Sequence, residues 1–250
     1  MNIEAKDLSK VYNSGENRVV ALDHANLEIV SSDFISIMGP SGSGKSTLLH
    51  LLSGLDRPTS GSLTYDGKDI YSYSDKELSA FRRKRIGFIF QQFNLLPVLT
   101  AKENIIMPLL LDKKQPDEAY LKQLTELLGI QGRLDHLPHE LSGGQQQRVA
   151  IARALMQQAK VILADEPIAS LDPESARIVM DTLRDINQND GITVVVTLHQ
   201  VDYALRYCER IVALRQGHVF YDGSSQQFDN ERFDHLYRSI NRVEENAKAA

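Results

Sequence analysis

Hydrophobic and polar residues follow two different patterns along this chain. Residues Ile3–Leu8 and Val19–Ile29 alternate between apolar and polar positions, which predicts two half-buried strands joined by a turn at Asn13–Gly15. Two later stretches, Phe34–Met38 and Ile86–Phe90, are almost continuously apolar and predict strands of a buried core. The first pair therefore predicts an antiparallel sheet, and the apolar stretches predict a second, more deeply buried one.

Helical spacing appears between and after these strands. Residues Lys45–Ser53 predict a first helix, and Ser74–Arg85 predict a charged one whose basic end is expected to be solvated. The stretch Thr100–His136 opens with a capping box and has helical apolar spacing, but Pro108 and Pro116 interrupt it. We therefore predict an α/β protein with an N-terminal antiparallel β subdomain, a mostly parallel core sheet and an inserted helical subdomain.

Length and charge limit the functions that such a fold can serve. The chain has 250 residues, 42% of them hydrophobic, which suits one large domain or a domain with an insertion. Its net charge of −5 and pI near 5.8 argue against a nucleic-acid partner. The single cysteine, Cys208, fits a reducing compartment. We expect neither a signal peptide nor direct membrane insertion, because Met1–Lys10 carries acidic residues and no apolar stretch is long enough.

A glycine-rich loop connects the first core strand to the first helix. It has the pattern G-x-x-x-x-G-K-[ST] in the strand-to-helix context that this pattern requires. Its glycines let backbone N–H groups surround a phosphate chain, and the helix N-terminus adds positive charge. Lys45 is placed to reach the β- and γ-phosphates, and Ser46 offers a hydroxyl to Mg²⁺. The predicted nucleoside-triphosphate loop comprises Gly39, Pro40, Ser41, Gly42, Ser43, Gly44, Lys45, Ser46 and Thr47.

A second phosphate-binding feature is predicted at Leu141–Gln145. Ser142 can cap a helix that runs to about Gln157, while Gly143 and Gly144 allow the backbone to approach another group closely. The start of such a helix suits a phosphate, yet one chain does not need two phosphate sites. We therefore expect this feature to complete the site of a second copy in a head-to-tail dimer around two nucleotides.

Polar side chains are predicted at the ends of two core strands. The buried strand Val161–Ala164 is followed by Asp165, which suits the Mg²⁺ shell, and Glu166, which can orient or deprotonate the attacking water. Gln91 follows Ile86–Phe90 and can place its amide oxygen on a metal ion or that water. A merely solvated acidic loop is the alternative, and the phosphate loop argues against it.

Taken together, these motifs resemble the ATP-binding subunits of ABC transporters over nearly the whole chain. The resemblance identifies Gly39–Thr47 as the Walker A loop and Gln91 as the Q-loop residue. It identifies Leu141–Gln145 as the signature segment. It also identifies Val161–Asp165 as the Walker B strand and Glu166 as the catalytic glutamate.

Three further assignments come from the same resemblance. Ser170–Asp172 matches the D-loop, and His199, after the strand Thr193–Thr197, matches the switch histidine that contacts the γ-phosphate. Tyr12 stands where the family has an aromatic residue that stacks on adenine, although an ordinary strand tyrosine is the alternative.

The resemblance implies a single ATPase domain. Its α/β core would comprise residues 1–90 and 156–223, its helical subdomain residues 91–155, and its helical tail residues 224–250 with a helix at Glu231–Val243. Two copies would close on two Mg·ATP, each signature segment covering the γ-phosphate held by the opposite Walker A loop. The implied partners are permease subunits in the cell membrane, on whose inner, cytoplasmic face the ATPase would lie.

The two halves of the chain resemble different transporter subfamilies. Residues 1–140, especially Phe34–Pro40 and Phe90–Pro97, resemble ATPases of lipoprotein-release, macrolide-export and bacitracin-type peptide transporters. Residues 141–250, with Pro167–Asp172 and Thr197–Gln200, resemble the phosphonate-importer ATPase. One hypothesis is a hybrid joined within Leu141–Leu155, and the other is one divergent subfamily. We expect an export or peptide-resistance permease as partner, with phosphonate import as the alternative.

ABC ATPases that do not serve transport are the alternative of a different class. A division-associated ATPase would couple to a permease-like membrane protein. The ATPases of repair, chromosome organisation and translation have no membrane partner and usually carry long coiled coils, zinc modules or two linked ATPase domains. None is predicted here, and the acidic charge also favours transport.

Overall fold

The chain forms two compact units in the structure, a computed structural model that describes residues 1–13, 15–228, 232 and 235–237. The helical unit consists of Met1, Val30–Asp33 and Ser72–Val196, and the β unit of Asn2–Ile29, Phe34–Tyr71 and Thr197–Ala250. The helix predicted at Glu231–Val243 lies largely outside the described residues. The subdomain boundaries predicted from the sequence stay a prediction.

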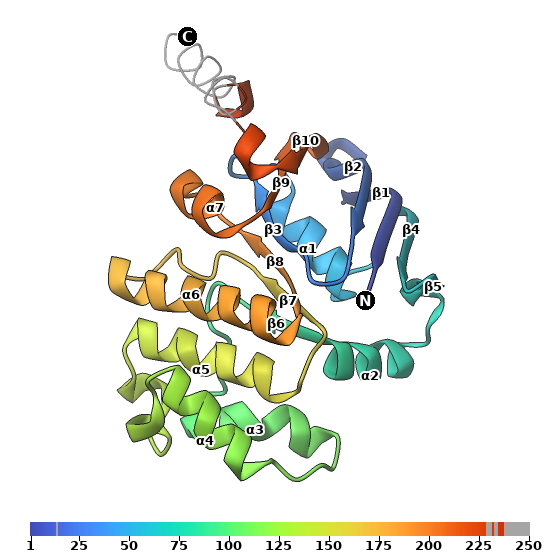
Figure 1. Ribbon diagram of the computed structural model, residues 1–250. Coiled ribbons are helices and arrows are strands. Elements are labelled where there is room, and N and C mark those ends of the chain that lie inside the picture. The colour runs from blue at the N-terminus through green and yellow to red at the C-terminus, as the bar shows by residue number, and fades with distance from the viewer. Residues whose placement is uncertain (14, 229–231, 233–234, 238–250) are drawn as a thin grey trace. The chain divides into compact units, whose positions relative to one another are not determined.

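An antiparallel sheet forms the first part of the β unit (Figure 1). Its strand order is β2-β1-β4-β5, with β1 at Ile3–Tyr12, β2 at Val19–Ile29, β4 at Ser60–Tyr65 and β5 at Lys68–Asp69. The register pairs Ile3 with both Ile29 and Tyr65. All three side chains are buried, which confirms that the apolar positions of the alternating pattern form the inward face of this sheet.

The second part of the β unit contains the strand that leads into the phosphate loop and the helix that follows the loop. Strand β3 (Phe34–Met38) is wholly buried and pairs in parallel with β9 (Arg210–Arg215), which pairs antiparallel with β10 (His218–Ser224). Helix α1 spans Lys45–Ser53, and helix α7 spans Val201–Tyr207. The predicted strand, loop and first helix are thus confirmed.

The helical unit contains a parallel sheet and five α-helices among its described residues (Figure 1). Strands β6 (Ile86–Ile89), β7 (Val161–Ala164) and β8 (Thr193–Thr197) pair in the order β6-β7-β8. Helix α5 packs against β6 and also against α3 and α4. The helices are α2 (Asp75–Arg85), α3 (Ala101–Leu111), α4 (Glu118–Leu127), α5 (Gly143–Met156) and α6 (Pro173–Asp190).

Side-chain caps fix where these helices begin. Ser74 and Thr100 each form a capping box with a glutamate three residues later, and Ser142 forms one with Gln145. Asp172 caps α6 by accepting hydrogen bonds from two backbone N–H groups of its first turn. The residues predicted to start α3 and α5 are therefore confirmed.

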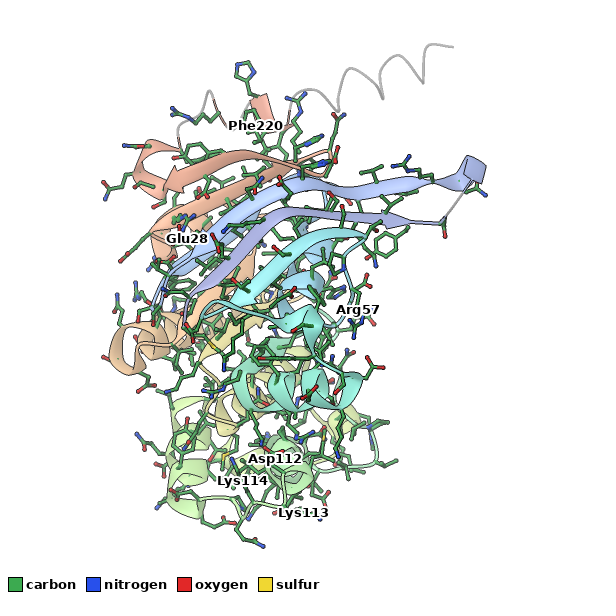
Figure 2. All side chains as sticks on the ribbon, turned by 90° about the vertical axis from the view of Figure 1, so that its right-hand side faces the viewer. Glu28, Arg57, Asp112, Lys113, Lys114 and Phe220 are labelled. Carbon is green, nitrogen blue, oxygen red and sulfur yellow. The ribbon has the colours of Figure 1, made fainter. Side chains whose placement is uncertain are left out.

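Of the two prolines predicted to divide the stretch after Thr100, Pro116 lies at the break and Pro108 does not. Pro108 lies inside α3 and does not divide it, and the helix continues for three more residues. A proline at this position removes only one backbone hydrogen bond of the helix. The break comes at Asp112, Lys113 and Lys114 (Figure 2), where Lys113 has a positive φ of 56°. Pro116 then lies in the linker before α4.

In the described part of the chain, no helix is long and apolar enough to span a bilayer.

Candidate active site

The phosphate loop is fixed at both ends and open in its middle. A Cβ atom at Gly39 would lie 2.2 Å from the carbonyl oxygen of Leu214, and one at Gly44 would lie 2.3 Å from that of Ala21. Both glycines also have positive φ, 147° and 102°. Gly42 has φ 75°, yet a Cβ there would meet nothing within 4 Å. Glycine is therefore required at the ends by space and in the middle by backbone conformation.

Polar groups inside the phosphate loop suit an anion. The buried Lys45 amine donates hydrogen bonds to the carbonyl oxygens of Gly39 (2.9 Å) and Pro40 (3.0 Å), which places it over the start of the loop. The Ser43 hydroxyl is buried and has no hydrogen-bond partner within the described structure. Helix α1 begins at Lys45, so its N-terminal N–H groups lie in the same loop. A phosphate group fits this combination of hydroxyl, amine and helix start.

Tyr12 is held by a cluster of charged side chains at the end of β1. Its hydroxyl donates to Asp56 Oδ2 at 2.8 Å, and the Lys10 amine donates to Asp56 Oδ1 at 2.6 Å. The same amine lies 4.9 Å from the centre of the Tyr12 ring. Burial and the Asp56 carboxylate raise the pKa of Tyr12, so the phenol stays neutral. The side chain is held in place and the residue is 36% exposed, which leaves area for stacking.

His199 also belongs to the β unit. It follows β8 and precedes α7, and its side chain is exposed. The preceding residue, Leu198, is buried and donates its N–H to the carbonyl oxygen of Ile37 at 3.2 Å. The backbone just before His199 is therefore anchored to β3, the strand that leads into the phosphate loop.

In the helical unit, two of the predicted catalytic side chains meet. Glu166 follows β7 and has a positive φ of 46°, an uncommon conformation for a residue with a side chain. Its carboxylate accepts a hydrogen bond of 2.9 Å from the side-chain amide of Gln91. Asp165 is nearly buried, and its N–H donates to the carbonyl oxygen of Ile89 at 2.8 Å. Backbone pairing between β6 and β7 thus brings Gln91 and Glu166 together across 75 positions of sequence.

The signature segment forms the start of α5. Ser142 accepts a hydrogen bond from the Gln145 N–H, and the Gln145 side chain accepts one from the Ser142 N–H. A Cβ at Gly144 would lie 2.6 Å from the hydroxyl oxygen of Ser175 on α6, so this glycine allows the two helices to pack closely. At Gly143, a Cβ would make only an ordinary contact of 3.8 Å with Phe93.

Two polar residues of α5 near the site were not identified from the sequence. Gln147 is buried and donates to the carbonyl oxygen of Pro167 at 2.8 Å, directly after Glu166. Arg153 donates to the carbonyl oxygens of Phe93 and Asn94 in the loop that follows Gln91. The available signal was their position, since both are polar residues within a helix that otherwise turns apolar side chains to the core.

The predicted metal ligands suit Mg²⁺ bound together with phosphate. Among the described residues, no three histidine, cysteine, aspartate or glutamate side chains form a metal cluster. Mg²⁺ is commonly held by one or two carboxylates, water and substrate phosphates instead of a full protein cage. In the helical unit, Gln91 offers an amide oxygen and Asp165 a carboxylate of this kind, and in the β unit Ser46 offers a hydroxyl. Their role stays a prediction.

Comparisons with known proteins agree with one another. A family model described as "ABC transporter" matches residues 22–169. The chain is 58% identical to the phosphonates import ATP-binding protein PhnC of Shigella boydii serotype 4 (strain Sb227), over 99% of this chain and 98% of that protein. It is 58% identical to the PhnC protein of Escherichia coli (strain K12), with the same coverage.

Solved structures show the same fold. The dimeric structure of MJ0796, a bacterial ABC transporter cassette, superposes with a TM-score of 0.83 at 43% identity. A dimeric post-hydrolysis state of the same cassette, bound to ADP and Pi, gives a TM-score of 0.82. Each match covers 89% of this chain and 98% of the solved one. This chain therefore belongs to the ATP-binding proteins of ABC transporters, a family of P-loop ATPases that power transport.

Proposed function

We propose that this chain is the ATPase subunit of a phosphonate importer. The observation that carries the proposal is its 58% identity to phosphonate-import ATPases along nearly the full length of both proteins. The first half of the sequence favours export or peptide resistance, and the comparisons support the phosphonate alternative better. The ATPase would work from the cytoplasmic face of the membrane, bound to integral permease subunits.

Export is a second candidate because specific segments favour it. Phe34–Pro40 and Phe90–Pro97 resemble exporter-type ATPases. The second segment belongs to the Q-loop region, which the resemblance to ABC ATPases implies is part of the groove that receives the permease. Both halves of the chain lie within the alignment to the phosphonate ATPases. A hybrid joined within Leu141–Leu155 remains a hypothesis. It is tested by identifying the type of permease that the chain binds.

Nucleotide binding would begin at the phosphate loop. In the proposed complex, Lys45 neutralises charge on the β- and γ-phosphates while the loop N–H groups and the Ser43 hydroxyl donate to phosphate oxygens. Tyr12, held by Lys10 and Asp56, stacks on the adenine ring. Mg²⁺, when bound, neutralises phosphate charge, and Ser46, Gln91 and Asp165 are the side chains that would hold it.

Hydrolysis would then require an oriented water molecule. Glu166 accepts a proton from this water as its oxygen forms a bond to the γ-phosphorus, and the bond from that phosphorus to the β–γ bridging oxygen breaks. The products are ADP and inorganic phosphate. Gln91, which contacts the Glu166 carboxylate, helps to orient the water, and His199 donates to a γ-phosphate oxygen.

A homodimer would complete the two sites. The start of α5, with Ser142, Gly143, Gly144 and Gln145, offers N–H groups and a hydroxyl to the γ-phosphate bound by the other copy. Dimers are observed for the MJ0796 cassette, which supports this arrangement.

The Glu166→Gln variant tests the proposed mechanism. It keeps the shape of the side chain but cannot accept the proton, so hydrolysis should fall by about 10² to 10⁴-fold while ATP binding persists. We expect an ATP-stabilised dimer by size-exclusion chromatography with light scattering. The exposed Glu118→Gln variant on α4 is the matched control and should behave like the wild type. A Glu166→Gln protein that stays monomeric with ATP and hydrolyses it normally would refute the mechanism.

The choice of permease tests the transport class. The chain should be co-expressed separately with a phosphonate-type permease and with a peptide-resistance permease, and stable complexes purified through a tag on the permease. We expect a complex with the phosphonate-type permease and stimulation of its ATPase activity. Pairing with the peptide-resistance permease alone would reverse the proposed substrate class and leave the ATPase mechanism intact.

A further inference from the structure

The loop after Gln91 adopts a left-handed backbone that is uncommon for residues with a side chain. Phe93 and Asn94 have positive φ values of 55° and 47°, and neither is glycine. Two consecutive left-handed residues with side chains persist only where surrounding contacts hold them. The Phe93 N–H donates to the carbonyl oxygen of Phe90 at 3.2 Å, which closes a tight turn around Gln91.

Arg153 supplies the contacts that hold this turn. Its guanidinium donates to the carbonyl oxygen of Asn94 at 2.7 Å and to that of Phe93 at 2.9 Å. The planar, forked geometry of arginine suits two adjacent acceptors at once. Burial lowers the pKa of Arg153, yet a guanidinium stays charged in proteins, so both hydrogen bonds are charge-assisted.

The same loop also contacts the beginning of α5. The Phe93 ring lies next to Gly143, where a Cβ atom would be 3.8 Å from the ring. Arg153 lies in the last turn of the same helix. The loop is therefore attached to the helix near both of its ends. The side chain of Gln91, two residues before Phe93, contacts Glu166.

We propose that Arg153 is a positioning residue that keeps the Phe93–Asn94 turn in its left-handed form and thereby holds the Gln91 amide at Glu166. This inference rests on the proposed function, in which Gln91 and Glu166 act on the attacking water. Without Arg153 the turn relaxes to ordinary φ values, and Gln91 leaves its place. The turn also links Gln91 to the signature segment, which is expected to serve the other copy's nucleotide.

Kinetics of Arg153→Gln provide the first test. A misplacement of about 1 Å at an active site can cost about 10²-fold, so we expect kcat to fall about 10- to 100-fold. The KM for ATP should change by less than about threefold, because Arg153 is not among the predicted nucleotide contacts. Arg153→Lys keeps the positive charge but loses the forked guanidinium, so its kcat should lie between those of the wild type and Arg153→Gln. Arg177→Gln, at an exposed arginine on α6, is the matched control.

Rescue by glycine separates positioning from general damage to the fold. Glycine adopts positive φ without strain, so Asn94→Gly should need less help from Arg153. We expect Asn94→Gly alone to be nearly neutral, and Asn94→Gly in the Arg153→Gln background to recover kcat by at least about threefold. A merely structural role would leave the double variant as impaired as Arg153→Gln.

Combination with Gln91→Ala shows whether Arg153 acts through Gln91. If it does, Arg153→Gln should lower kcat by less than about twofold further once Gln91 has been replaced. Full additivity of the two effects, an unchanged kcat in Arg153→Gln, or no rescue by Asn94→Gly would each overturn the inference. A wild-type protein without Mg²⁺-dependent ATPase activity would instead overturn the proposed function and the inference with it.

Discussion

Replacement of Asn104 gives the sharpest prediction of stability for this chain. This asparagine lies in α3, is fully buried and bonds to the loop that precedes the helix. Its amide donates to the carbonyl oxygens of Leu96 (3.1 Å), Leu99 (3.0 Å) and Thr100 (3.0 Å). Its side-chain oxygen accepts from the Leu96 N–H at 2.8 Å. One side chain thus organises the loop between β6 and α3.

The cost of Asn104→Ala follows from the groups that lose their partner. The Leu96 and Thr100 carbonyl oxygens also accept from backbone N–H groups, so they keep a hydrogen bond. The Leu96 N–H and the Leu99 carbonyl lose the bond that Asn104 supplies. Each unsatisfied group costs about 1–3 kcal/mol. Because the loop is partly exposed and water can reach it, we expect a total near the lower end, about 3 kcal/mol.

Thermal and urea unfolding of the variant measure this cost. For a chain of this size, about 3 kcal/mol corresponds to a Tm lower by roughly 6–12 °C. The exposed Asn189→Ala variant on α6 is the control and should unfold close to the wild type. A loss below about 1 kcal/mol for Asn104→Ala would show that the loop does not depend on this side chain.

The Asn104→Asp variant adds a dependence on pH. The new carboxyl group would be buried and face three carbonyl oxygens, so its pKa in the folded protein should lie above the unfolded value. The folded state then binds more protons than the unfolded state, and stability falls as pH rises above the unfolded pKa. We therefore expect a greater loss of stability at pH 7 than at pH 5, and the reverse order would contradict the geometry.

Three further predictions concern other positions. Gly144→Ala should lower kcat for ATP hydrolysis by about tenfold, because its Cβ would lie 2.6 Å from the Ser175 hydroxyl, and Ser175→Gly in the same chain should restore activity; an unchanged kcat would contradict the packing. Lys45→Met should weaken binding of a fluorescent ATP analogue by more than about tenfold, since the phosphates lose a positive charge; unchanged binding would remove Lys45 from the site. Burial raises the pKa of Cys208, so at pH 8 its thiol should react with Ellman's reagent more than about tenfold faster in urea than in the native protein; equal rates would show that it is accessible.

Features encoded by neighbouring residues were predictable from the sequence. The bounds of β2, β3 and α1 agree with the predicted ones, because side-chain alternation and the strand–loop–helix pattern are local signals. The starts of α3 and α5 follow from capping chemistry within four residues, at Thr100 and Ser142. The fold class followed from the order of these elements, and the family comparisons confirm it.

Features that depend on distant residues were not predictable in detail. The contact between Gln91 and Glu166 requires the pairing of β6 with β7, and the roles of Gln147 and Arg153 require α5 to lie against the Gln91 and Glu166 loops. Pro108 was expected to end a helix because proline usually does so, but α3 accommodates it near its end. For the contacts of Gln91, Gln147 and Arg153, tertiary packing decided the result.

The left-handed backbone at Glu166 limits how this protein can be made more robust. Replacing such a residue with glycine commonly relieves strain and raises thermal resistance, so a screen for heat-tolerant variants would favour changes at this position. Those variants would lack the carboxylate on which the proposed chemistry depends. Selection for durability and selection for turnover should therefore act in opposite directions at this one residue, and improvements in the former are better sought elsewhere in the chain.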